Sequence, residues 1–214
     1  MSIGSITEAE TIFRYAQSLK VVTKQEKDNR IHADEWNHHQ WLVEEFEKGW
    51  RRDPGPFVPR HAFGPVNKKP ELPYGWEVKG AGISRRAYLS PSGVIYKIQH
   101  HEEQSQSNAE EHDFAQRVRR MGNVIGVIIP RTALYYIDNQ PVIAMEFMDG
   151  EIQHPDWDRC GVWNGGCNCS ARAGYCTDTI RRKIQHTFNI GDLHSNNVLW
   201  IPKQRKWAVV DLGM

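Results

Sequence analysis

The chain has 214 residues, which is long enough for one sizeable domain with an appendage. Its 27 basic and 26 acidic residues leave a formal net charge of +1, so charge gives no reason to expect nucleic acid or a membrane as a partner. No apolar run approaches the roughly 20 residues of a membrane span. The N-terminal region also lacks the apolar segment and cleavage site of a signal peptide. We therefore expect a soluble, cytoplasmic protein.

The N-terminal quarter predicts two helices and then a linker. Residues 1–20 offer Ser5 or Thr7 as a helix cap and carry an apolar side. The polar stretch TKQEKDNR is expected to separate this helix from a second one at 33–50, where aromatic residues recur at helical spacing. The six prolines between residues 51 and 73 favour an extended linker.

The segment YGWEVKGAGISRRAYLSPSGVIYKIQ predicts three antiparallel strands, which end near Lys79, span 86–90 and span 94–99. Gly80 and Gly82 open the first hairpin, and a pair of glycines at such a place often does no more than make a turn. Lys97 lies among apolar neighbours in the third strand. A lysine there is either an exposed edge charge or a cation with a function.

A helix is predicted at 107–121, and either Glu110 or Glu111 on it could pair with Lys97; otherwise both are solvated helix residues. Residues 124–130 and 133–137 resemble strands. A further apolar strand, PVIAMEFMDG, follows the turn at 139–140. Apolar strands that end in Asp-Gly are common, so the meaning of this one depends on its place between the other motifs.

All four cysteines fall in one segment rich in Gly and Asn, with the spacing C-x6-C-x-C-x6-C: Cys160, Cys167, Cys169 and Cys176. With little apolar content, the segment is not expected to fold by burial alone. A structural Zn²⁺ held by four thiolates would supply the missing folding energy. Free thiols are an alternative, and disulfides are disfavoured in a reducing cytoplasm.

The segment after a predicted helix at 177–188 carries the strongest chemical pattern. Asp192 is followed five residues later by Asn197, and Asp211 opens an Asp-Leu-Gly triplet. Two short strands joined by the polar turn PKQRK would bring these three side chains together at the same end of the hairpin. Phosphoryl transfer needs such a set, namely one carboxylate that accepts the proton of a hydroxyl and two oxygen ligands for Mg²⁺.

Taken in order, G-x-G, Lys97, the helix glutamate, PVIAMEFMDG, Asp192/Asn197 and DLG resemble the motifs of the protein-kinase-like superfamily over residues 74–214. The Asp-Leu-His form at Asp192 is similar to aminoglycoside and other small-molecule phosphotransferases. The longer DLHS-x-N form looks still more like the short serine/threonine kinases of T7-like bacteriophages. The third glycine of the family loop is replaced by Arg85.

The resemblance implies an α+β, bilobal fold that binds ATP and Mg²⁺. Asp192 would be the base, Asn197 and Asp211 the Mg²⁺ ligands, and Lys97 the phosphate clamp paired with Glu111. His194 would bond the γ-phosphate or have a structural role. Gly80 and Gly82 would belong to the loop that covers the ATP phosphates. Adenine would lie among side chains and backbone groups of the remaining family positions: Ala87, Ile95, Met145, Glu146, Met148 and Leu199.

The resemblance also implies the domain limits: a helical segment at 1–50, the linker at 51–73, a five-stranded N-lobe with hinge at 74–148, and a truncated C-lobe at 149–214 with a Cys-rich insert at 158–177. The N-terminal helices would replace the missing lower lobe, or a partner or second copy would cover it. The expected function is a phage-type protein serine/threonine kinase acting on host proteins. The alternatives are a small-molecule phosphotransferase and a non-catalytic nucleotide-binding or partner-binding module.

Overall fold

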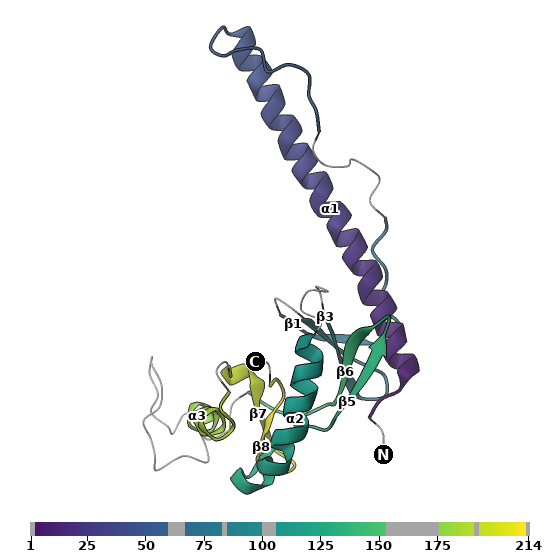
Figure 1. Cartoon of the computed structure of the whole chain (residues 1–214), viewed down its shortest axis with the longest axis vertical. Helices are drawn as coiled ribbons and strands as arrows, with labels where there is room; N and C mark the ends of the chain where they lie inside the picture. Colours follow the sequence, from purple (N-terminus) through teal and green to yellow (C-terminus); the bar gives the residue numbers. More distant parts are fainter. Residues whose placement is uncertain are drawn as a thin grey trace. The chain divides into compact units, whose positions relative to one another are not determined.

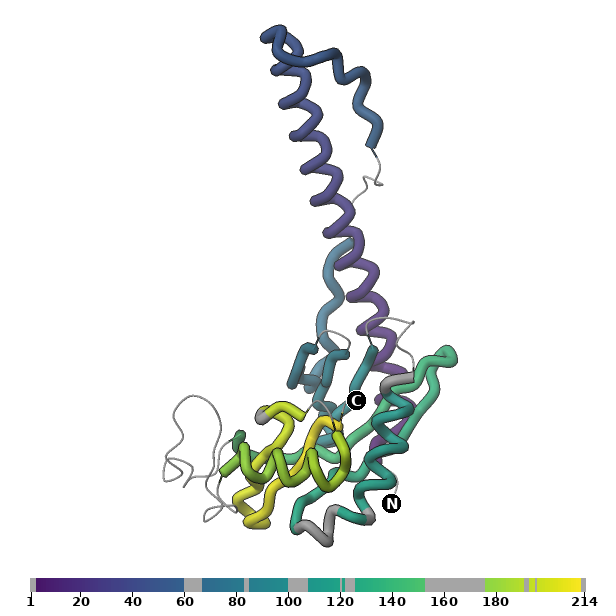
Figure 2. The backbone as a smooth tube through the Cα atoms, turned by 60° about the vertical axis from the view of Figure 1, so that its left-hand side comes forward, coloured from purple at the N-terminus to yellow at the C-terminus, as the bar shows by residue number. Residues whose placement is uncertain are grey.

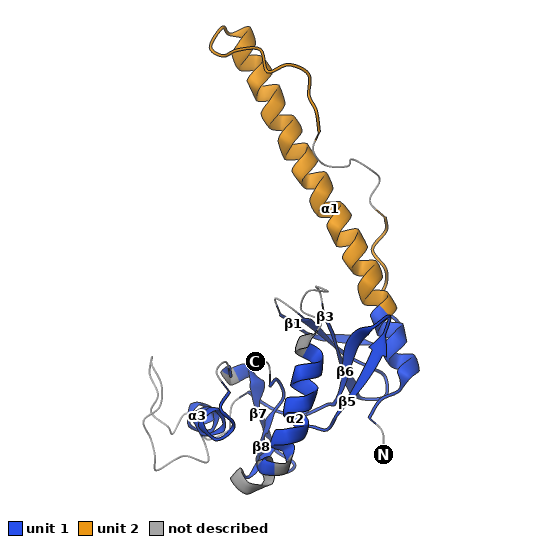
Figure 3. Ribbon diagram, viewed as in Figure 1, with its two compact units in different colours: residues 1–13, 73–214 blue, residues 14–72 orange. Residues whose placement is uncertain are grey.

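The computed structural model describes residues 3–59, 67–82, 85–99, 106–152, 176–190 and 193–212. The chain divides into two compact units, coloured separately in Figure 3. The first unit combines the N-terminal residues Met1–Phe13 with Pro73–Met214, and the second is Arg14–Leu72. The expected domain limits given above stay a prediction.

One helix, α1 (Ile6–Glu47), replaces the two predicted N-terminal helices. The Ser5 side chain caps it by accepting the Glu8 N–H at 3.1 Å. The helix ends at Gly49, which has a φ of +76° and whose N–H bonds the Phe46 carbonyl. The prediction of a break at 23–30 was wrong, because the Lys, Gln and Glu residues there are good helix formers and their polarity indicates exposure only.

The second unit has its own aromatic cluster on the exposed part of α1. Phe57 lies 5.0 Å from Trp36 and 5.4 Å from His39, measured between ring centroids. Trp36, Phe46 and Trp50 nevertheless keep much of their surface exposed. The expected burial of this face in a substitute lower lobe stays a prediction.

The first unit is α+β and contains a five-stranded antiparallel sheet in the order β1-β2-β3-β6-β5 (Figure 1). Its strands span β1 (Glu77–Ala81), β2 (Arg85–Leu89), β3 (Val94–Gln99), β5 (Thr132–Ile137) and β6 (Gln140–Glu146). The predicted third strand has the observed limits of β3. Left-handed backbone at Asp138 and Asn139 makes the tight turn between β5 and β6.

The beginning of α1 packs on this sheet through Tyr96 of β3. The Tyr96 hydroxyl accepts the Ser5 N–H at 2.9 Å and donates to Glu8 Oε2 at 2.8 Å. Ile12 and Phe13 are buried, and the Tyr135 hydroxyl donates to the Ile3 carbonyl at 2.9 Å. The N-terminal residues thus belong to the core of the first unit.

Helix α2 (Gln106–Ile125) contacts both sheets of this unit (Figures 1 and 2). The second sheet has the order β4-β8-β7, with β4 (Val127–Ile128), β7 (Val198–Ile201) and β8 (Lys206–Val209). Helix α3 (Thr177–Phe188) has its predicted limits and contributes Ile180, Ile184 and Phe188 to one core with Phe114 and Val118 of α2.

The predicted strand at 124–130 was wrong at its start. Helix α2 continues to Ile125 and ends at Gly126, whose φ of +75° marks a left-handed helix end. Only Val127 and Ile128 then pair with β8, in parallel. The β-branched residues of this stretch favoured a strand locally, but the helix continues through them to Ile125.

The backbone after β6 passes very close to β7 at Gly150. A Cβ atom added there would lie 2.9 Å from the Trp200 carbonyl oxygen and 2.5 Å from Ile201 Cδ1. Next to it, Glu151 and Trp200 exchange two backbone hydrogen bonds of 2.8 and 2.6 Å. Gly150 is therefore required so that the segment leaving the first sheet can pair with the second.

Gly150→Ala should lower the free energy of unfolding by roughly 1–3 kcal/mol, because the added methyl meets backbone that cannot give way. Chemical denaturation followed by circular dichroism measures this. Gly80→Ala is the matched control, since its Cβ would lie 3.9 Å from Ala87, an ordinary contact. Equal unfolding free energies for Gly150→Ala and Gly80→Ala would contradict the conclusion that glycine is required at position 150.

Burial raises the pKa of the Tyr96 hydroxyl well above that of an ordinary tyrosine, and the nearby Glu8 carboxylate acts in the same direction. The unfolded chain therefore loses this proton first as the pH rises, so stability is present below the ordinary pKa and falls above it. We expect Tyr96→Phe to flatten the decline of unfolding free energy between about pH 9 and 11, by up to about 1.4 kcal/mol per pH unit. Denaturant titrations across this range test it, and parallel curves for both proteins would refute it.

Candidate active site

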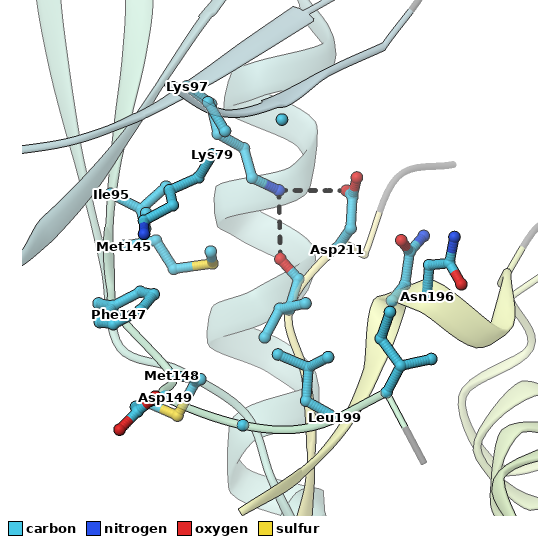
Figure 4. A pocket seen from close by; sticks show the side chains of 16 residues that line it. Lys79, Ile95, Lys97, Met145, Phe147, Met148, Asp149, Asn196, Leu199 and Asp211 are labelled. Atoms are coloured by element: carbon cyan, nitrogen blue, oxygen red, sulfur yellow. Dashed lines mark hydrogen bonds and ion pairs between the residues drawn. The ribbon is translucent and has the colours of Figure 1, made fainter. Parts of the chain in front are cut away.

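Four charged side chains meet where β2, β3, α2 and the chain after β8 come together. Lys97 Nζ donates to Glu111 Oε1 at 2.6 Å and to Asp211 Oδ1 at 3.2 Å. It also reaches the Val210 carbonyl at 3.3 Å, as Figure 4 shows. Arg85 donates to Glu111 through Nη1 and to Asp211 Oδ1 through Nη2, the latter at 3.2 Å. The cluster is formally neutral.

The side chains of this charge cluster differ in how deeply they are buried. The side chains of Lys97 and Glu111 are 7% and 3% exposed, whereas that of Asp211 is 36% exposed. An unpaired charge at the depth of Lys97 or Glu111 would be costly, so each fixes the other in place. Asp211 is the carboxylate of the cluster that an incoming ligand can reach.

Alternation along β3 explains why Lys97 points to this site. Neighbouring side chains of a strand face opposite sides of the sheet, and Tyr96 faces the beginning of α1. Lys97 therefore faces α2 and the C-terminal hairpin. Glu111 is the helix residue that meets it, and Glu110 is exposed.

Asn108 fixes the first turn of α2 against the sheet. It is fully buried, and its Nδ2 donates to the Lys97 and Pro141 carbonyls, both at 2.9 Å. Its Oδ1 accepts a long hydrogen bond of 3.5 Å from Arg85. Because Glu111 follows one helical turn later, Asn108 sets the position of the carboxylate that holds Lys97.

The β7–β8 hairpin brings Asn197 and Asp211 to the same end. Val198 pairs with Val209, and the Val210 N–H donates to the Asn197 carbonyl at 2.9 Å. A short 3-10 turn, Ser195–Asn197, precedes β7. Asn197, just before β7, and Asp211, just after β8, thus lie at the same end of the hairpin, where each offers an oxygen ligand.

A cavity of about 510 Å³ lies beside this cluster. Its lining includes Lys97, Asn197 and Asp211 together with four apolar side chains from both sheets, Ala87, Ile95, Met145 and Leu199. Figure 4 shows Ile95 and Met145 on one side and Leu199 on another. The remaining lining residues are Lys79, Gly80, Phe147, Met148, Asp149, Gly150, Ile152, Asn196 and Val210.

The segment after β6 forms one wall of the cavity through Phe147 and Met148. Glu146 does not line it, and its N–H donates to the Arg131 carbonyl at 2.9 Å. Because the Glu146 N–H is already bonded, only the backbone carbonyl oxygen of Glu146 could contact the adenine of a nucleotide. Gly82 and Glu111 also lie outside the lining.

Among the residues that the structure describes, none requires glycine at positions 80 and 82. Added Cβ atoms would have their nearest contacts at 3.9 and 3.7 Å, and neither residue has left-handed backbone. Strand β1 is exposed along its length. A need for glycine here would therefore come from a ligand that approaches the backbone closely.

Several predicted site residues lie outside the part of the chain that the structure describes. These include Asp192 and three of the cysteines, so the base and the zinc site stay predictions. Cys176, just before α3, is buried. His194 is exposed and does not line the cavity, and its carbonyl accepts the Asn197 N–H at 3.0 Å. Within the described residues, no group of three or more His, Cys, Asp or Glu side chains could hold a metal.

Two residues of the site have no role assigned from the sequence. Arg85 is noted there only as a replacement for a glycine, and Asn108 is not singled out. Arg85 and Asn108 both form hydrogen bonds with residues that lie far away in sequence, so no local sequence pattern identifies those partners. Lys79, which lies 5.5 Å from the Phe147 ring, was also missed as a lining residue.

No protein-family model and no curated protein sequence matches the chain. Solved structures with a similar backbone include an aminoglycoside phosphotransferase, described as the GDP and kanamycin complex of APH(2'')-IIIa. The identity is 12%, the match covers 65% of this chain and 67% of that chain, and the TM-score is 0.41. A likeness at this level carries no conclusion about function. The resemblance to phage kinases stays a prediction.

No helix in the described ranges has both the length and the apolar character that crossing a bilayer demands.

Asn108→Asp should place a carboxylate oxygen against the Lys97 and Pro141 carbonyls and so lose two buried hydrogen bonds. We expect a loss of roughly 2–4 kcal/mol in unfolding free energy, at the upper end of the cost of unpaired buried groups. Thermal and denaturant unfolding measure it. Asn196→Asp, an exposed change that also adds a negative charge, is the control, and a comparable loss there would contradict the assignment.

Proposed function

We propose that the first unit binds a magnesium-nucleotide and is a phosphotransferase that uses ATP. The observation that supports this most strongly is the convergence of Lys97, Glu111 and Asp211 beside one cavity. A lysine held by a buried glutamate and facing a carboxylate is the arrangement that positions nucleotide phosphates and their metal in kinase-like transfer.

The cavity walls suit a flat base. Ala87 and Ile95 come from the five-stranded sheet and Leu199 from β7, so apolar groups from both sheets border one space. Its volume of about 510 Å³ falls in the range typical of small-molecule sites. Met145 of β6 and Met148 of the segment that follows it add adaptable apolar surface.

The polar end of the cavity suits phosphates and Mg²⁺. Asn197 and Asp211 both line it and supply the hard oxygen donors that Mg²⁺ prefers. Lys97 provides a cation for phosphate oxygens. A bound Mg²⁺ would neutralise charge that develops on the transferred phosphoryl group. Asp192, placed by its spacing from Asn197, is proposed as the group that accepts the proton of the acceptor hydroxyl.

Two acceptor classes are consistent with this site. The Asp-Leu-His sequence at 192–194 favours a small hydroxyl compound, whereas the longer DLHS-x-N form favours serine or threonine of a protein, including host proteins. A third outcome is a module that binds nucleotide without transfer. The four side chains that transfer needs, Lys97, Asn197, Asp211 and Asp192, are all present, and a binding module requires no base.

Transfer from γ-labelled ATP to lysate proteins and to a set of aminoglycosides tests the proposal and separates the acceptors. Asp192→Asn should reduce labelling by about 10²–10⁴-fold and leave Mg-ATP binding unchanged, because only the proton acceptor is lost. Glu111→Gln should weaken both the labelling and the binding of Mg-ATP. Glu110→Gln, at the exposed neighbouring position, should change neither the labelling nor the binding. Undiminished labelling by Asp192→Asn would refute the role of that residue. Mg-ATP binding with no labelling of any acceptor would leave only the nucleotide-binding part of the proposal.

A further inference from the structure

We propose that Arg85 is a second phosphate-binding residue, which holds Asp211 before the ligand arrives and turns to the nucleotide once Mg²⁺ engages that carboxylate. The inference rests on the proposed nucleotide site and adds to it a residue that the family pattern does not supply. Arg85 begins β2, directly after the hairpin of Gly80 and Gly82.

Two cations converge on a single anionic oxygen in this structure. Lys97 Nζ and Arg85 Nη2 each lie 3.2 Å from Asp211 Oδ1. One carboxylate oxygen between two donors occupies the kind of position that a phosphate oxygen fills, with a charge-assisted hydrogen bond from each side. The site is thus arranged for an anion before any nucleotide is present, and Asp211 supplies that anion.

Binding of Mg²⁺ changes the partner that Nη2 can have. The metal needs a lone pair of Asp211 at about 2.0–2.1 Å, and a guanidinium beside that ion would be repelled by it. Phosphate oxygens arriving with the metal are the nearest replacement acceptors. Lys97 and Asp211 line the cavity whereas Arg85 does not, so Nη2 must turn toward the cavity for this exchange.

The other half of the guanidinium remains anchored during the exchange. Arg85 Nη1 bonds Glu111 Oε2 and lies 3.5 Å from Asn108 Oδ1, both on α2. The side chain is 14% exposed, so it has little freedom to leave for solvent. A guanidinium has five N–H donors in a planar fork, so it can keep one carboxylate while binding a second anion. A lysine at this position could not do both with fixed geometry.

The test compares Mg-ATP with adenosine, which lacks phosphates, by isothermal titration calorimetry on the whole chain. Arg85→Gln should weaken Mg-ATP binding about 10- to 100-fold, the usual range for a lost charge-assisted hydrogen bond, and leave adenosine unchanged. Arg85→Lys keeps the positive charge and should give an intermediate loss. Arg86→Gln is the matched control, because the next residue of β2 faces the opposite side of the sheet and should leave both affinities unchanged.

The outcomes separate this inference from the function on which it rests. If the unmodified protein binds neither ligand, both are overturned. If it binds Mg-ATP and Arg85→Gln binds it equally well or more tightly, only the inference fails, and tighter binding would mean that Arg85 merely keeps the metal out. Parallel losses for Mg-ATP and adenosine would indicate a structural role and also overturn it. Should Arg85→Gln not fold, Arg85→Lys takes its place. A loss of affinity for Mg-ATP without a loss for adenosine would then support the inference, and an unchanged ratio of the two affinities would overturn it.

Discussion

The ion pair between Lys97 and Glu111 is the interaction on which the rest of the site depends. It joins the central strand β3 to α2 at 2.6 Å, with both side chains almost wholly buried. Removing two charges from water costs several kcal/mol for each ion, so such a pair adds little to stability and fixes geometry instead. Arg85, Asp211 and Asn108 each bond one of these two residues.

Neutrality of the cluster follows from this constraint. A lysine and a glutamate alone would leave Asp211 as an uncompensated negative charge near the buried pair, and Arg85 supplies the balancing cation. The Leu212 N–H also reaches Glu111 Oε1, at 3.4 Å, so the chain after β8 is held by backbone as well as by charge. Several bonds at once thus fix the geometry of the cluster, which would reduce the reorganisation that the proposed chemistry requires.

Local patterns predicted the parts of the fold in which local and tertiary preferences agree. β3 and α3 have their expected limits. The short run of β3 is buried on both faces, and the helical spacing of Ile180, Ile184 and Phe188 matches the face of α3 that becomes buried. The polar stretch inside α1 and the end of α2 were misjudged, because exposure and packing decided them. In the site, Lys97 and Asp211 stand out from apolar neighbours in sequence. Arg85 and Asn108 do not, because their partners lie 11 to 126 residues away.

Helix α2 is tied down along its length, and this limits how the site could be controlled. Asn108 bonds β3 and β6, Gln116 donates to the Thr132 carbonyl at 3.2 Å, and Phe114 and Val118 enter the core shared with α3. Swinging this helix outward to uncouple Glu111 would break contacts with both sheets at once. A signal that controls the proposed activity would therefore have to act at the exposed end of the charge cluster, by competing for Asp211, rather than by moving the scaffold.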